Sequence, residues 1–308
     1  MKDIYSDYLK FVKNALKIAT KIPKYFSKFS NKIYCNYQKC AIYLFMQKLK
    51  TTARGVISLI KASSEIQMLL ELKRIPVHTT IIRFGKKIEK RIDRLLDIRQ
   101  ANNVAVDSTG FETESKSYYF RNIQNSDKPQ KTKRYVKLSV CVDTDKLFIL
   151  KYKIRRKLRN DHIDFKKVLQ NIETKKVFAD KGYDSKKNRQ FVLNKLRAIP
   201  IIPVRGHNNF YGYLKLGKKV DGRDYHQRSK VETVFSMIKR KYGSVLRNKT
   251  FATQKVELIS KLIAHNIDRM QYYFLFLSRG LHQSLFSEAL YTCCLHKTKE
   301  KLYKCFLF

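Results

Sequence analysis

Over residues 1–97, apolar side chains recur every three or four residues, with lysines between them. This is the spacing of one face of an α-helix, so the pattern predicts a helical N-terminal region. Within it, residues 64–73 and 79–99 are expected to form two helices, joined by a proline-marked turn at 74–77.

From residue 101 onward the pattern changes to short apolar runs separated by turn residues, which is typical of β-strands. The predicted strands are 104–106, 118–120, 135–142, 147–152, 177–179 and 199–204, and two helices are predicted at 161–172 and 185–196. Residues 143–146 have the composition of a hairpin turn. Pro200 and Pro203 suit a strand at the edge of a sheet, where a missing N–H leaves no ladder bond unmade. These elements predict a mixed α/β fold that follows the helical region.

A further helix is predicted at residues 224–243, where polar and apolar side chains separate onto different faces. Asp224 and Gln227 resemble a capping box, the last turn is basic, and Gly243 ends the helix. At about 100° per residue, four polar side chains fall within an arc of about 60°. They are Tyr225, Arg228, Glu232 and Lys239. Beside them runs an apolar stripe that is expected to pack on the sheet, formed by Val231, Val234 and Ile238.

Two aspartates, Asp107 and Asp180, stand upstream of that helix, each at the end of a predicted apolar strand. Acidic side chains at strand ends lie at the rim of a sheet. Taken alone, each aspartate is equally well explained as a turn former or helix cap, and Glu232 as an ion-pair partner of Arg228 or Lys239. If the three acids meet, their charges repel, and divalent cations would relieve the repulsion. Carboxylates suit Mg²⁺ or Mn²⁺, and two such ions support phosphodiester chemistry.

The charge balance is strongly basic, because 66 Lys and Arg against 25 Asp and Glu give a formal charge of +41. Such a surplus repels itself in a compact chain unless a polyanion binds, which favours nucleic acid as the partner. An AT-rich genome is the alternative explanation for part of the lysine excess.

No signal-peptide pattern and no apolar stretch near the roughly 20 residues of a membrane span are found in the sequence, so no membrane association is expected and the cytoplasm is the predicted compartment. Among the cysteines, one cluster has conceivable metal ligands, namely Cys293, Cys294, His296 and Cys305. Buried reduced thiols are the favoured interpretation of these cysteines.

The motifs around the three acids resemble those of DDE-type transposases of bacterial and archaeal insertion sequences, over residues 75–270. Tyr225-x2-Arg228-x3-Glu232-x6-Lys239 resembles the Tyr-Arg-Glu-Lys signature of one large group of these enzymes. Val106-Asp107-Ser-Thr-Gly is similar to the block around the first catalytic aspartate, and Phe178-Ala-Asp180-Lys-Gly-Tyr-Asp-Ser to the block around the second.

The resemblance implies a ribonuclease-H-like core, which is a mixed sheet flanked by helices. Its expected order is three strands, a helix, a fourth strand, a helix, a fifth strand and a helix, with the first and fourth strands adjacent and parallel and the fifth at an edge. The chain is expected to divide into a basic, helical DNA-binding region at 1–98, a catalytic domain at 99–270 and a helical tail at 271–308.

The resemblance also implies roles for the site residues. Asp107, Asp180 and Glu232 are expected to bind two Mg²⁺ or Mn²⁺ ions, Arg228 and Lys239 to contact DNA phosphate, and Tyr225 to position the DNA. The implied reaction is cleavage at the inverted repeats of a transposon, followed by attack of the freed 3′-hydroxyl on target DNA. A homodimer that holds both transposon ends in the prokaryotic nucleoid is the expected assembly.

Two alternatives to an active transposase stay open at this stage. One is a basic DNA-binding remnant that has lost catalysis, and the other is a host nuclease built on the same core. The predicted helix at 79–99 carries Arg83 and Lys86, and a basic helix after a short turn is a layout that DNA-reading proteins use. Two helices joined by a turn are also common scaffolding in any helical domain.

Overall fold

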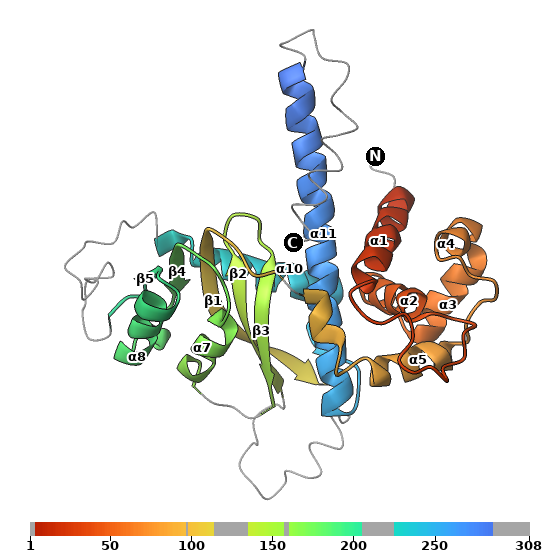
Figure 1. The fold of residues 1–308 in the computed structure, drawn as a ribbon, viewed down its shortest axis with the longest axis horizontal. Coiled ribbons are helices and arrows are strands. Elements are labelled where there is room, and N and C mark those ends of the chain that lie inside the picture. The colour runs from red at the N-terminus through yellow and green to blue at the C-terminus, as the bar shows by residue number, and fades with distance from the viewer. Residues whose placement is uncertain (1–3, 97, 114–134, 157–159, 205–224, 286–308) are drawn as a thin grey trace, which may run out of the picture.

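The computed structural model describes residues 4–96, 98–113, 135–156, 160–204 and 225–285. Its N-terminal part is helical, as predicted, and is the red and orange region of Figure 1. The elements are α1 (Ile4–Ala19), α2 (Asn36–Lys48), α3 (Ala53–Ala62), α4 (Ser64–Leu69), α5 (His78–Lys87) and the 3₁₀-helix η1 (Ile92–Leu96). The predicted strand 118–120, the capping residue Asp224 and the cysteine cluster at 293–305 lie outside the described residues.

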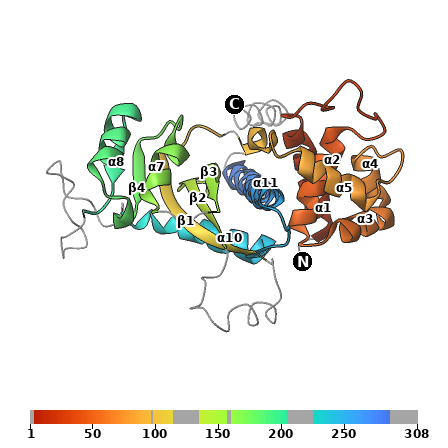
Figure 2. The same ribbon diagram turned by 90° about the horizontal axis from the view of Figure 1, so that it is seen from below.

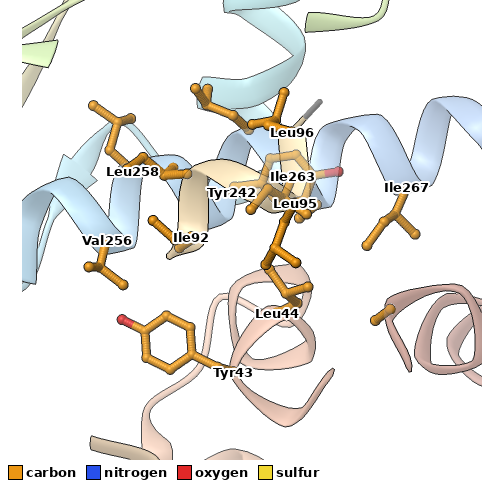
Figure 3. Packing of buried hydrophobic residues seen from close by; sticks show 14 of the residues in the cluster. Tyr43, Leu44, Ile92, Leu95, Leu96, Tyr242, Val256, Leu258, Ile263 and Ile267 are labelled. Atoms are coloured by element: carbon orange, nitrogen blue, oxygen red, sulfur yellow. The ribbon is translucent and has the colours of Figure 1, made fainter. Parts of the chain in front are cut away.

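The long helix predicted at 79–99 is wrong, because α5 ends at Lys87 and a separate short helix follows at η1. Ile92, Leu95 and Leu96 of η1 are all buried. They face the long C-terminal helix in Figure 3, a contact that a straight extension of α5 does not provide. Tertiary packing has therefore overridden a locally helical sequence.

The strands form one mixed sheet in the order β3-β2-β1-β4-β5, with β6 pairing only with β1. Their bounds are β1 (Asn103–Thr113), β2 (Tyr135–Asp143), β3 (Ile149–Arg155), β4 (Lys176–Ala179), β5 (Ile199–Ile201) and β6 (Val245–Leu246). β1 and β4 are adjacent and parallel, β2 and β3 form an antiparallel hairpin, and the proline-containing β5 lies at an edge. The order expected for a ribonuclease-H-like core is confirmed.

Helices cover both faces of this sheet (Figure 2). One face carries α7 (His162–Leu169), η2 (Lys181–Tyr183), α8 (Lys186–Gln190) and the π-helical turn η3 (Phe191–Lys195), and the other carries α10 (Ser229–Tyr242) and α11 (Phe251–Leu285). Residues of β1 alternate between the two layers: Val104 and Val106 pack with the α7 side, whereas Ala105 and Phe111 pack with the α10 side.

The first strand is longer than the sequence predicted, since β1 continues from Asn103 to Thr113 and does not end at Asp107. Antiparallel pairing with β2 runs as far as Glu112–Tyr135, and this non-local ladder holds the Ser-Thr-Gly segment at 108–110 extended. That segment has turn-forming composition, so no local signal predicts the extension.

The helix α11 lies between the sheet and the N-terminal helices (Figures 1 and 2). Its buried side chains, which include Val256, Ile263 and Ile267, join a cluster that extends from Phe11 of α1 to Val140 of β2. Figure 3 shows part of this packing around Leu44 and Tyr242. The helical region and the sheet therefore share one apolar cluster. None of the helices in the described part of the chain combines the length and apolar character required to span a bilayer.

Candidate active site

Sheet register brings the two aspartates together. β4 pairs with β1 as far as Val106 opposite Ala179. Asp107 and Asp180 are the residues that directly follow this last pair in the two segments. Asp180 has an extended backbone, with φ −71° and ψ 161°, which continues the alternation of β4 beyond its last paired residue. Both side chains are expected on the same face as Ala105 and Phe178, which pack on the α10 side.

The edge of β1 next to Asp107 is open. β4 stops at Ala179 and β6 pairs only with Glu112 and Thr113, so residues 107–111 have no strand partner on that side within the described ranges. The Ser108 amide, 2.8 Å away, donates to Asp107 Oδ1. The Lys181 amide likewise donates to Asp180 Oδ1 at 2.7 Å, which makes Asp180 the cap of η2.

The third acid, Glu232, lies on α10, which packs against β1. Val231, Val234 and Ile238 are buried, as the predicted apolar stripe requires. At the far end of the helix, Lys239 Nζ donates to Thr109 Oγ1 at 2.7 Å. That contact ties α10 to β1 two residues beyond Asp107.

The polar face of α10 begins in a turn that precedes the regular helix. The predicted helix starts at 224, whereas α10 starts at Ser229 after a turn at 227–228. Arg228 nevertheless donates to Glu232 Oε1 at 2.8 Å and lies 5.9 Å from the ring centroid of Tyr225. Tyr225, Arg228 and Glu232 therefore lie together at the start of α10, whereas Lys239 contacts Thr109 near its other end.

The three carboxylates influence one another electrostatically. Burial raises the pKa of Asp107 above its ordinary value, and the carboxylates of Glu232 and Asp180 raise it further. The Ser108 amide and the Arg228 guanidinium oppose this rise. Two acids from other elements thus act on Asp107, as expected where negative charges converge.

The acids do not close around a common point in this structure. Among the residues that the structure describes, no three His, Cys, Asp or Glu side chains are arranged to hold one metal ion. Glu232 is paired with Arg228, and its side chain is 54% exposed, so it is free to change rotamer. Hard oxygen donors that repel one another suit Mg²⁺ or Mn²⁺. The donor chemistry therefore fits these ions, once Glu232 turns from Arg228 toward the aspartates.

Comparison with known proteins identifies the family. The chain matches the family described as the transposase DDE domain over residues 99–267, which is more than half of its 308 residues. The chain belongs to the DDE transposase family. All three acids lie within the matched residues.

The other comparisons add little to this assignment. No curated protein sequence matches the chain. Among solved structures, a piggyBac transposase synaptic complex with hairpin DNA is similar at a TM-score of 0.46 and 12% identity, over 91% of this chain and 74% of that chain. A likeness of that size supports no functional conclusion.

The remaining predicted DNA-contacting residues of this DDE transposase family member lie on the helical region. Arg83 and Lys86 are both exposed on α5. α5 packs against α2, α3 and α11. Lys86 borders a cavity of about 440 Å³ between the helical region and the end of α10, and none of the three acids lines it.

Sequence reasoning missed a set of polar residues on the opposite face of β1. Ser108, Lys137 and Asp161 line a cavity of about 620 Å³, and neither Asp107 nor Asp180 is among its lining residues. Ser108 and Tyr183 stand inside the two blocks that resemble the family motifs, next to and three residues after an acid. Their position in those blocks is the signal that would have pointed to them.

Proposed function

We propose that the protein is a DNA transposase of the Tyr-Arg-Glu-Lys group, which cuts DNA at the ends of a transposon and joins the freed ends to target DNA. The observation that carries this proposal is that Asp180, at the end of β4, and Glu232, on α10, both raise the pKa of Asp107 on β1. Membership of the DDE transposase family supports it.

The three acids are proposed to hold two divalent ions, Mg²⁺ or Mn²⁺. When bound, such a pair activates an attacking water or sugar hydroxyl and stabilises the leaving oxygen of a phosphodiester. Water then cuts the DNA at each inverted repeat, and the 3′-hydroxyl so exposed attacks a phosphodiester of the target. No covalent intermediate with the protein is required by this sequence of displacements.

Arg228 connects DNA binding to the state of Glu232. The Arg228 guanidinium donates to Glu232 Oε1 at 2.8 Å. A DNA phosphate offers Arg228 an alternative bidentate partner of equal geometry. Transfer of Arg228 to the phosphate frees Glu232 to turn toward Asp107. Assembly of the site is thereby made dependent on the substrate.

The other basic residues are assigned to substrate binding. Lys239, which is fixed by Thr109, contacts a phosphate near the cut, and Tyr225 positions the DNA beside it. The helical region at 1–98 binds DNA through side chains such as Arg83 and Lys86, and the formal charge of +41 provides the attraction. Because two transposon ends must be held together, a homodimer is the proposed synaptic assembly.

The decisive experiment is a cleavage assay with purified protein, Mg²⁺ and a DNA fragment that carries the inverted repeats flanking the gene. We expect nicking at the repeat ends by the wild type and at least a hundredfold less by Asp107→Asn, because metal-assisted steps contribute several kcal/mol to the barrier. Asp145→Asn is the matched control, since Asp145 is an exposed acid in the β2–β3 turn. Equal activity in all three proteins refutes the proposal.

A DNA-binding remnant without catalysis is the second candidate. The observation that favours it is that no three acids of the described chain are spaced to hold one ion. Both candidates bind DNA with the same dependence on salt, so binding does not separate them. Nicking that requires Mg²⁺ and is lost in Asp107→Asn excludes the remnant.

A further inference from the structure

We infer that Ser108, Asp161, Lys137 and Tyr183 form a positioning network beneath the acids, which fixes the spacing of Asp107 and Asp180 and thereby sets the affinity for divalent ions. The inference rests on the proposed function, because it assumes that these aspartates bind metal. The four residues come from β1, the start of α7, β2 and η2. Hydrogen bonds join the first three, and Tyr183 packs in the apolar cluster on the same face of the sheet, opposite α10.

Ser108 is the centre of the network. Its amide donates to Asp107 Oδ1 at 2.8 Å, and its hydroxyl donates to Asp161 Oδ2 at 2.6 Å. Since successive residues of a strand point to opposite faces, the Ser108 hydroxyl lies behind the sheet while Asp107 faces α10. One residue therefore links the first aspartate to the layer below it.

Asp161 is placed where a helix cap is expected, but its side chain does not cap. It is the N-cap residue of α7, and it makes no side-chain hydrogen bond to the helix. Its two carboxylate oxygens are used instead by Ser108 and by the ammonium of Lys137, with which it forms an ion pair. Asp residues at this position normally stabilise the helix by capping it. Both oxygens therefore bind side chains of the strands β1 and β2, and neither caps the helix.

Lys137 joins the network from the neighbouring strand. It pairs with Gly110 in the β1–β2 register, and directly paired residues share a face, so its side chain lies on the same side as Ser108. Only 12% of its side chain is exposed, and burial lowers its pKa while the negative charges of Asp164 and Asp107 oppose that change. A charge in this setting is costly to leave without its carboxylate.

Tyr183 connects the network to the second aspartate. It follows Asp180 by three residues through η2, and its ring is 1% exposed and packs against Phe165 at 5.5 Å. Its hydroxyl is buried and makes no hydrogen bond to any described residue. Burial raises the pKa of Tyr183, the charge of Asp107 raises it further, and interaction with the Ser108 side chain lowers it.

The hydroxyls supply a consistent chain of donors. Ser108 gives its proton to Asp161, so its oxygen keeps lone pairs for a hydrogen bond that the Tyr183 hydroxyl would donate. Formation of this bond requires a small approach of η2 to β1. That approach would bring Asp180 closer to Asp107. A buried hydroxyl without a partner is unfavourable in itself, and formation of that bond would remove the penalty.

The test is calorimetric titration of the full chain with Mn²⁺ alone, in the absence of DNA. We expect Tyr183→Phe and Asp161→Asn each to weaken Mn²⁺ binding by about tenfold or more, which is the usual effect of removing a group that orients a metal ligand. Tyr183→Phe removes only an unpaired hydroxyl, so its unfolding midpoint should equal or exceed that of the wild type. Tyr152→Phe is the matched control, because the Tyr152 hydroxyl donates to Asp93 on the other face of the sheet.

Cleavage measured against Mg²⁺ concentration gives the second measurement. The two variants should require more Mg²⁺ for half-maximal rate and should recover most of the wild-type rate at saturation. Wild-type Mn²⁺ affinity in Tyr183→Phe and Asp161→Asn overturns the network and leaves the proposed function intact. If Asp107→Asn binds Mn²⁺ as tightly as the wild type, the metal site itself is refuted, and the network with it.

Discussion

Acidic side chains in two regions of the molecule are treated very differently by their surroundings. At the junction of α10, α11 and the helical region, Asp268 is 6% exposed and accepts from Lys48 at 2.7 Å, from the Tyr242 hydroxyl at 2.7 Å and from Lys241 at 3.2 Å. At the strand ends, Asp180 accepts one hydrogen bond from a described residue, the amide of Lys181.

Glu257 at the junction repeats the first pattern. It accepts from the Arg247 amide, from the Asn248 amide and from the Asn248 side chain, and it lies 3.5 Å from Lys261 Nζ. A carboxylate has about four acceptor sites. The junction acids have most of these sites occupied by protein donors, whereas Asp107 and Asp180 each accept from a single backbone amide among the described residues. The difference separates carboxylates that hold the fold together from carboxylates with acceptor sites left open for the proposed metal ions.

The largest contrast is expected in stability after removal of one acid from each region. Asp268→Ala leaves the largely buried Lys48 ammonium and the buried Tyr242 hydroxyl without their acceptor, and we expect a loss of about 3–5 kcal/mol. Asp180→Ala removes only a cap of a short helix, and we expect a loss of about 1 kcal/mol. Urea unfolding measures both. Equal losses contradict the distinction between the two regions.

The second largest effect is expected at low pH, where protonation of His265 should lower the stability of the junction. His265 is 1% exposed, its Nε2 lies 2.9 Å from the Leu147 carbonyl oxygen, and burial lowers its pKa to about 4. Arg269 and Lys241 act in the same direction, and Asp268 opposes them. Folding lowers the pKa of His265 from about 6.5, so its contribution to the free energy of unfolding is fully present above pH 6.5. That contribution is lost as the pH falls toward 4, and the total loss is about 3 kcal/mol.

Thermal unfolding between pH 7 and pH 4 measures that loss. His265→Gln cannot take up a proton, so its stability should depend less on pH over this interval, even if it is lower at pH 7. An unchanged pH dependence in His265→Gln assigns the loss to other groups and contradicts the role of His265.

The smallest effect on stability is expected at Glu232. Its side chain is 54% exposed, and its pairing with Arg228 is an i,i+4 contact on a helix surface. Such pairs contribute about 0.3–0.5 kcal/mol, so Glu232→Gln should change the free energy of unfolding by less than 1 kcal/mol. Its Mn²⁺ affinity, measured by the same titration, should nevertheless fall. Glu257→Gln is the matched variant at the junction, and it should lose stability without losing Mn²⁺ binding.

The sequence predicted the elements that depend on local patterns. The turn at Asp143 is an example, since Asp143 Oδ1 accepts from the amides of Asp145 and Lys146 in a tight hairpin. The edge position of β5 followed from its prolines, and the buried stripe of α10 followed from helical periodicity. Each of these features is encoded within a few neighbouring residues.

The features that the sequence did not predict depend on distant partners. β1 runs through a turn-like Ser-Thr-Gly segment because β2, some thirty residues later in the chain, pairs with it. The helix after His78 stops at Lys87 because η1 is buried against α11. The contact between Ser108 and Asp161 joins residues 53 positions apart. Hydrophobic periodicity carries no information about such pairings.

The two layers packed against α11 constrain how this chain can evolve. One side of the helix packs against α1, α2 and α5, and another against β3, β6 and α10. A substitution on α11 that packs well against one layer must also leave the packing against the other layer intact. Recombination that brought in a new N-terminal region from a relative would meet an ill-fitting helix, so we expect residues of α2 and α11 to have changed together during the divergence of this lineage.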